Sequence, residues 1–89
     1  MTTEQREQAR HALGLPNKKR CSYRNRFVCD GGDPHWTDMV AKGWAKMRAG
    51  DSLPFGGCAM FWLTKAGAEL ALGKGERLSL EDFPPTSEV

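Results

Sequence analysis

The segment from residue 59 to residue 67 constrains the fold of this chain more than any other, because it joins an alternating apolar run to a helix start. In a strand the side chains point to opposite faces in turn. One face would receive Ala59, Phe61 and Leu63, and the other Met60 and Trp62. Thr64 then stands where its side-chain oxygen can accept from the free backbone amides that begin a helix. The pattern predicts a strand over 59–63 and a helix over about 65–72.

The length of 89 residues fits one small domain, which we expect over residues 1–83, with a mobile tail over 84–89. No apolar run approaches the roughly 20 residues that a membrane helix needs. The first five residues are polar and lack the apolar core of a signal peptide. We therefore expect a cytoplasmic protein that does not enter a membrane.

The net charge of +2 is unevenly distributed along the chain. Residues 1–48 carry ten Lys or Arg against five Asp or Glu, whereas residues 49–89 carry three against six. Five of the cations fall within nine residues: Lys18, Lys19, Arg20, Arg24 and Arg26. Such a cluster would neutralise phosphates or dock an acidic protein surface. A solvated, flexible loop is the alternative for a charge run of this kind.

The rest of the chain predicts two further helices and a second strand. Thr2 followed by Gln5 fits a capping box for a helix over 3–13, with Thr3 as the alternative cap, and Gly14 ends the helix. Its apolar stripe is thin, so we expect this helix on the outside of the domain. Residues 21–29 alternate, which predicts a strand that exposes two arginines and places Tyr23 and Phe27 on its other face.

The second helix has the clearest start. Asp33 is a good N-cap, and Pro34 suits the first helical position. Apolar residues at helical spacing extend the prediction to about residue 48, ahead of a hairpin tip over 52–58. We expect the third helix to pack through Ala66, Leu70 and Ala71. The fold class is therefore α+β: three helices with a small antiparallel sheet.

No pattern in the sequence predicts catalysis, a metal site or a cofactor. The three cysteines, at 21, 29 and 58, contain no C-x-x-C pair, which argues against structural zinc and for small buried or half-buried thiols. Neither His11 nor His35 lies in a motif that supplies a nucleophile with a base and an orienting group. We expect a protein that is not an enzyme.

Residues 34–72 resemble the winged-helix family in part. The segment 39–44 is similar to the end of its recognition helix, 52–58 to its wing tip, and 61–67 to its return strand with the Leu-Thr-x-x-Gly pattern. The resemblance implies a partial winged-helix arrangement. It also implies that three cations lie near a DNA backbone: Lys42, Lys46 and Arg48. It also implies that three residues are candidates for contacts with the edges of DNA bases: His35, Thr37 and Asp38.

The whole chain resembles small proteins of bacteriophages and prophages. The resemblance rests on Leu-Gly-Leu-Pro, Ser-Tyr-Arg-Asn-Arg-Phe and Phe-Trp-Leu-Thr-Lys-Ala-Gly-Ala-Glu. Such proteins include gene regulators and inhibitors of host defence, among them anti-CRISPR proteins. It implies a setting in the cytoplasm of a bacterial host cell and, as partner, either DNA or a host nucleoprotein complex.

Together these observations predict a non-enzymatic binding module that engages nucleic acid. The residues expected to bind are Lys18, Lys19, Arg20, Tyr23, Arg24, Arg26, Lys42, Lys46 and Arg48. The alternative is an inhibitor that covers a host protein complex with the same arginine and aromatic side chains, which are frequent in binding hot spots. A further interpretation is that Tyr23 and Phe27 are buried in the core and that both arginines are solvated. A homodimer, which would add burial to a small core, stays open.

Overall fold

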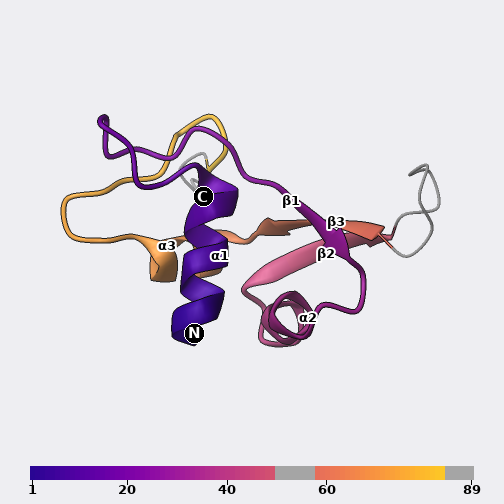
Figure 1. Cartoon of the computed structure of the whole chain (residues 1–89). Helices are drawn as coiled ribbons and strands as arrows, with labels where there is room; N and C mark the ends of the chain where they lie inside the picture. The colour runs from indigo at the N-terminus through magenta and orange to yellow at the C-terminus, as the bar shows by residue number, and fades with distance from the viewer. Residues whose placement is uncertain (50–57, 84–89) are drawn as a thin grey trace, which may run out of the picture.

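Three helices and three strands make up the part of the chain that the computed structural model describes, residues 1–49 and 58–83 (Figure 1). The elements are, in chain order, α1 (Thr3–Leu13), β1 (Phe27–Asp30), α2 (Pro34–Ala41), β2 (Ala45–Ala49), β3 (Cys58–Leu63) and α3 (Lys65–Ala71). The predicted α+β class is confirmed. No helix in these two ranges is both long and apolar enough to cross a membrane.

The three strands form one antiparallel sheet with β3 at its centre, in the order β1-β3-β2. Directly paired residues share a face of the sheet, and faces alternate along each strand. The register pairs Phe27 and Met47 with Phe61, and it pairs Val28 and Arg48 with Met60. The sheet therefore has two chemically different faces, which we call the closed face and the open face. The closed face consists of Phe27, Cys29, Ala45, Met47, Ala59, Phe61 and Leu63. The open face consists of Val28, Asp30, Lys46, Arg48, Cys58, Met60 and Trp62.

The core lies between the closed face and the helices. The ring of Trp36, from α2, stacks between Phe27 and Phe61, with centroid distances of 5.3 Å to each. In Figure 1, α1 lies at the left end of the sheet and in front of α3, and α2 is seen end-on below the strands. The same hydrophobic cluster takes in buried apolar side chains from all three helices: Ala9, Ala12, Leu13, Met39, Ala68 and Ala71. Contrary to prediction, α1 is thus a core helix, because small side chains let it approach closely.

The turn from β3 into α3 is fixed by Thr64, as predicted. Its Oγ1 accepts from the backbone N of Gly67 at 3.2 Å and donates to the carbonyl of Gly43 at 2.8 Å. A Cβ on Gly67 would lie 2.0 Å from the carbonyl oxygen of Trp44, so only glycine fits there. Helix α3 consequently packs through Gly67, Ala68 and Ala71, while the expected contacts Ala66 and Leu70 are exposed.

Two element boundaries differ from the prediction. Helix α2 ends at Ala41, since Gly43 turns the chain with a φ of 80° and residues 45–49 pair with β3. Strand β1 begins only at Phe27, because the free carbonyls at the end of α1 bind the preceding segment. Leu13 accepts from the backbone N of Tyr23 at 3.1 Å. The predicted hairpin tip, apart from Cys58, and the predicted tail over 84–89 lie outside the described residues.

Candidate nucleic-acid interface

The open face presents two cross-strand rows that mix cations with large apolar side chains. The first row is Val28, Met60 and Arg48, fixed by the pairing on both sides of β3. In the second row Lys46 pairs directly with Trp62. The outer position of that row belongs to Arg26.

The position of Arg26 follows from Asn25, because the side chain of Asn25 bonds to the backbone of β3 one step beyond the β1–β3 pairs. The amide of Asn25 donates to the carbonyl of Leu63 at 3.0 Å and accepts from its backbone N at 2.8 Å. Because Phe27 pairs with Phe61, the register puts Arg26 opposite Trp62. Arg26 itself precedes β1, so within the ladder the indole of Trp62 is paired with one cation, Lys46.

None of the described helices packs on the open face. Met60 and Trp62 do not contact the hydrophobic cluster that the helices build, and both side chains are half-buried. Val28 is 57% exposed, which is high for a valine in a strand. A sheet face of this kind is typical of a surface that another molecule covers.

The cations of the open face have no carboxylate partner among the described residues. The two ion pairs in those ranges join Arg10 to Glu76 and Lys42 to Asp38. Asp30 is the one acid on the described part of the face, and it pairs with Cys58 at the far end. The charges of Arg26, Lys46 and Arg48 are therefore not compensated by a carboxylate of residues 1–49 or 58–83.

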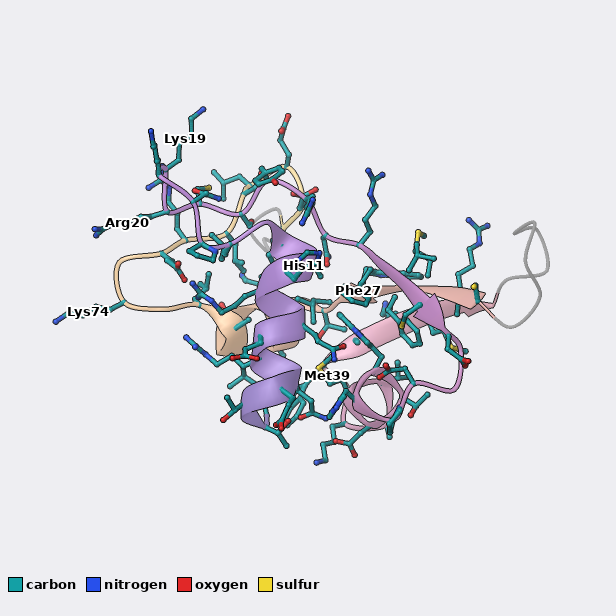
Figure 2. The ribbon with its side chains drawn as sticks, in the orientation of Figure 1. His11, Lys19, Arg20, Phe27, Met39 and Lys74 are labelled. Carbon is teal, nitrogen blue, oxygen red and sulfur yellow. The ribbon has the colours of Figure 1, made fainter. Side chains whose placement is uncertain are left out.

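A second basic surface, which we call the loop cluster, joins two segments that are far apart in sequence. It consists of Lys18, Lys19, Arg20, Lys74 and Arg77, all exposed. The backbone N of Arg77 donates to the carbonyl of Arg20 at 2.9 Å, and Cys21 forms a parallel bridge with Arg77. Lys19, Arg20 and Lys74 point away from the body of the protein in Figure 2. Sequence analysis missed Lys74 and Arg77, because no local pattern predicts a bridge between residues 56 apart.

Tyr23 and Arg24 lie between the loop cluster and the open face. Tyr23 is 63% exposed, so its ring is not a core side chain. The Arg24 guanidinium lies 5.4 Å from the centroid of that ring and donates to the carbonyl of His11, with Nη2 at 2.8 Å. Arg24 is therefore held by a backbone carbonyl and keeps its charge uncompensated by any carboxylate of the described residues.

Lys42 does not share a surface with the other predicted cations. It caps α2, where its Nζ lies 3.1 Å from Asp38 Oδ2. Asp38 also accepts from Gln5 Nε2 at 2.7 Å. The bond from Gln5 and then that from Lys42 lower the pKa of Asp38. The predicted helix that carries Lys42, Lys46 and Arg48 together is thus wrong, and Asp38 is engaged inside the protein.

Cys29 lies on β1 and Cys58 on β3, whereas Cys21 lies outside the helices and strands. Among residues 1–49 and 58–83, no group of three His, Cys, Asp or Glu side chains is placed to hold a metal ion. Burial, followed by the charges of Asp33 and Asp30, raises the pKa of the Cys29 thiol to about 11. Its reactive thiolate is consequently scarce at neutral pH.

No protein-family model, curated protein or solved structure matches this chain.

Proposed function

We propose that this protein is a non-enzymatic module that binds single-stranded nucleic acid, DNA in the first instance, on the open face of its sheet. The observation that carries the proposal is the second row of that face, in which Trp62 pairs directly with Lys46, with Arg26 one residue before β1 on the other side. An indole ring offers a stacking surface to an unpaired base, and the flanking cations neutralise the phosphates on either side.

The geometry favours a single strand over a duplex. Three strands spaced about 4.8 Å apart make a face roughly 10 Å from outer strand to outer strand, which suits one chain of nucleotides. In a duplex the bases are already stacked on each other, so Trp62 would have no free base to contact. The exposed surface of α2 offers little to a DNA groove, since Lys42 is paired with Asp38.

The loop cluster extends the same surface toward Tyr23 and Arg24. A strand that crosses the open face and continues past Arg24 would reach these further cations. Its contribution is electrostatic and independent of sequence, because phosphate contacts position a ligand without identifying its bases. The resemblance to phage proteins supports placing the module in the cytoplasm of a bacterial host.

Fluorescence anisotropy of a labelled 12-nucleotide single strand tests the proposal. We expect binding at 50 mM salt that weakens with a log–log salt slope of about −2, given three cations on the face. Trp62→Ala should weaken binding by about 1–3 kcal/mol. The double variant Lys46→Ala/Arg48→Ala should flatten the salt slope. Lys65→Ala, an exposed cation on α3, is the matched control and should leave both quantities unchanged.

Two results would contradict the proposal. One is the absence of binding to the single strand at 50 mM salt, and the other is wild-type binding by Trp62→Ala. A duplex of the same sequence should bind more weakly than the single strand. Tighter duplex binding would remove the stacking role of Trp62.

The exposure of Tyr23 favours a second candidate function, the inhibition of a host nucleoprotein complex through a protein contact. Tyr23 lines a hollow of about 490 Å³ together with residues 17–19, Ser79 and Glu81. Leu80, which lies between the last two in sequence, is 71% exposed. A tyrosine anchor with an arginine beside it is typical of a protein-binding hot spot. Binding of this type would depend on Tyr23 and would change little with salt, in contrast to the open face.

A further inference from the structure

A hollow of about 250 Å³ lies between the end of α1 and the outer strand β1, and it is lined by His11, Arg24, Arg26, Phe27 and Val28. No carboxylate of the described residues is part of this lining, so its charge is that of the two arginines. The hollow is several times larger than the roughly 30 Å³ of one water molecule, which leaves room for a polyatomic group. Figure 2 shows His11 on α1 and Phe27 at β1, on the two sides of this region.

The end of α1 brings the two arginines to the same place. The carbonyl of Ala12 accepts from the backbone N of Arg26 at 3.3 Å. The carbonyl of His11 accepts from Nε and Nη2 of Arg24, at 3.2 Å and 2.8 Å. The segment before β1 is therefore bound to the last turn of the helix through both residues, and this arrangement is present before any ligand arrives.

The negative end of α1 does not oppose an anion in the hollow. A helix leaves its last four carbonyls without partners inside the helix, and they carry a partial negative charge. In α1 all four are bonded, since Arg10 accepts from the backbone N of Leu15 at 2.8 Å and Leu13 from that of Tyr23 at 3.1 Å, in addition to the two bonds above. The guanidinium of Arg24 covers one of these carbonyls, so the charge nearest the hollow is positive.

The donors that remain suit the oxygens of a phosphate. The bonds to His11 use Nε and Nη2 of Arg24 and leave Nη1 without an acceptor among residues 1–49 and 58–83. Arg26 is exposed, and its guanidinium pairs with no carboxylate in the same ranges. Guanidinium groups bind phosphate oxygens through parallel N–H bonds, and the ring of His11 adds a further donor.

The wall of the hollow is rigid on the side of β1. The rings of His11 and Phe27 meet edge to face, with 5.6 Å between their centroids, and Phe27 stacks on Trp36 at 5.3 Å. Because Trp36 is fully buried, Phe27 cannot shift without disturbing the core. A ligand therefore meets a preformed wall, which lowers the entropy that binding costs.

We propose that this hollow binds the terminal phosphate of the nucleic-acid strand. A terminal phosphate monoester carries a charge of about −1.5 to −2 at pH 7 and three acceptor oxygens, whereas a phosphodiester within the strand has one charge and two such oxygens. Two arginines on one hollow match the larger charge, while Lys46 and Arg48 of the open face lie in separate rows. This inference rests on the proposed function, because Arg26 lines the hollow and also lies beside Trp62 in the second row.

Two small phosphates test the site without any base. Methyl phosphate represents the end of a strand, and dimethyl phosphate represents a phosphodiester within it. In an NMR titration at pH 7.5, we expect methyl phosphate to shift the Nε–H signal of Arg24 and the ring protons of His11. Dimethyl phosphate should bind about tenfold more weakly, because its smaller charge makes weaker bonds to the guanidinium groups. An absence of these shifts with methyl phosphate overturns the site, and equal binding of the two phosphates overturns the preference for a strand end.

Three 12-nucleotide strands with an internal label test the same site in the nucleic acid. They carry a 5′-phosphate, a 3′-phosphate or hydroxyl groups at both ends. One of the phosphorylated strands should bind about fivefold to tenfold more tightly than the strand with two hydroxyl ends, through the added charge-assisted bonds. Arg24→Gln and Arg26→Gln should each remove this ratio. Lys46→Gln is the matched control, because Lys46 belongs to the open face but does not line the hollow. It should weaken the binding of all three strands and keep the ratio.

The outcomes separate this inference from the proposed function. Equal affinity for the three strands, or a ratio that survives both arginine variants, overturns the assignment of the terminal phosphate even where Trp62 still binds the strand. Shifts with methyl phosphate together with no binding of any strand overturn the open face and, with it, the strand as the source of the phosphate. The dispersion of the NMR spectra checks the fold of each variant. Arg26→Gln keeps the test valid if Arg24→Gln disturbs the helix end, since the recorded bond of Arg26 to α1 comes from its backbone.

Discussion

The two faces of the sheet are made by the same three strands, yet the residues of the closed face are apolar, whereas the open face mixes apolar side chains with charged ones. On the closed face, Phe61 and Leu63 are at most 2% exposed and lie under the helices. On the open face, Met60 and Trp62 alternate with Lys46 and Arg48 and have no described helix above them. Cations beside the apolar groups make a second helical layer unfavourable, because a covering helix would have to bury them. The comparison shows that an apolar strand residue is core only where its cross-strand neighbours allow burial.

The largest expected effect is the difference in stability loss between replacing Phe61 and replacing its neighbour Trp62. Phe61→Ala should lower the free energy of unfolding by about 3–5 kcal/mol, because the ring is fully buried against Trp36. Trp62→Ala should lower it by less, about 1 kcal/mol, since its loss leaves no enclosed cavity. Urea unfolding followed by circular dichroism measures both. Equal destabilisation by the two variants would mean that the open face is covered in solution.

The local signals of the sequence predicted the parts of the fold that depend on neighbouring residues. The caps at Thr2, Asp33 and Thr64 are present as expected, as is the alternation that splits the residues of β3 between the two faces. Residues 45–49 satisfy both a helical spacing and an alternation of two. Only the pairing with β3, a contact distant in sequence, decides between them.

The sequence predicted which types of residue form the candidate site, but it did not predict which of these residues lie side by side. Lys46 lies opposite Trp62, and Arg48 lies opposite Met60, because of the strand register, which cannot be read from the sequence. Residues 21–26 satisfy the pattern of a strand, yet the carbonyls at the end of α1 hold the chain at Tyr23 and Arg26.

Acid should lower the free energy of unfolding, because it protonates Glu76, which binds α1 through Arg10. This carboxylate binds Arg10 of α1 and accepts from the backbone N of Gly73 at 2.6 Å. The bond from Arg10 above all lowers the pKa of Glu76 from the ordinary 4.5 to about 2. A depressed carboxyl pKa stabilises the fold above pH 4.5, and this contribution is lost as the pH falls from about 4.5 to about 2.

The variant Glu76→Gln checks this assignment. It should cost about 1–3 kcal/mol at pH 7, the value of a hydrogen bond between charged groups, and should reduce the loss of stability between pH 4.5 and pH 2. Glu81→Gln, an exposed carboxylate outside any ion pair of the described residues, is the control. Identical pH profiles for the two variants would show that the Arg10–Glu76 pair does not hold α1.

The smallest effect contrasts Cys29 of the closed face with Cys58 of the open face. Burial and two aspartates raise the pKa of Cys29 from 9.0 to about 11, which lowers its thiolate fraction about a hundredfold. Iodoacetamide at pH 7.5 should therefore modify Cys29 last of the three cysteines, as followed by peptide mass spectrometry, and the order should vanish in urea. A single-stranded oligonucleotide should slow the modification of Cys58, which lies at the end of the open face, without changing that of Cys29. Protection of Cys29 instead would place the ligand on the closed side, where the helices already lie, and would reverse the assignment of the two faces.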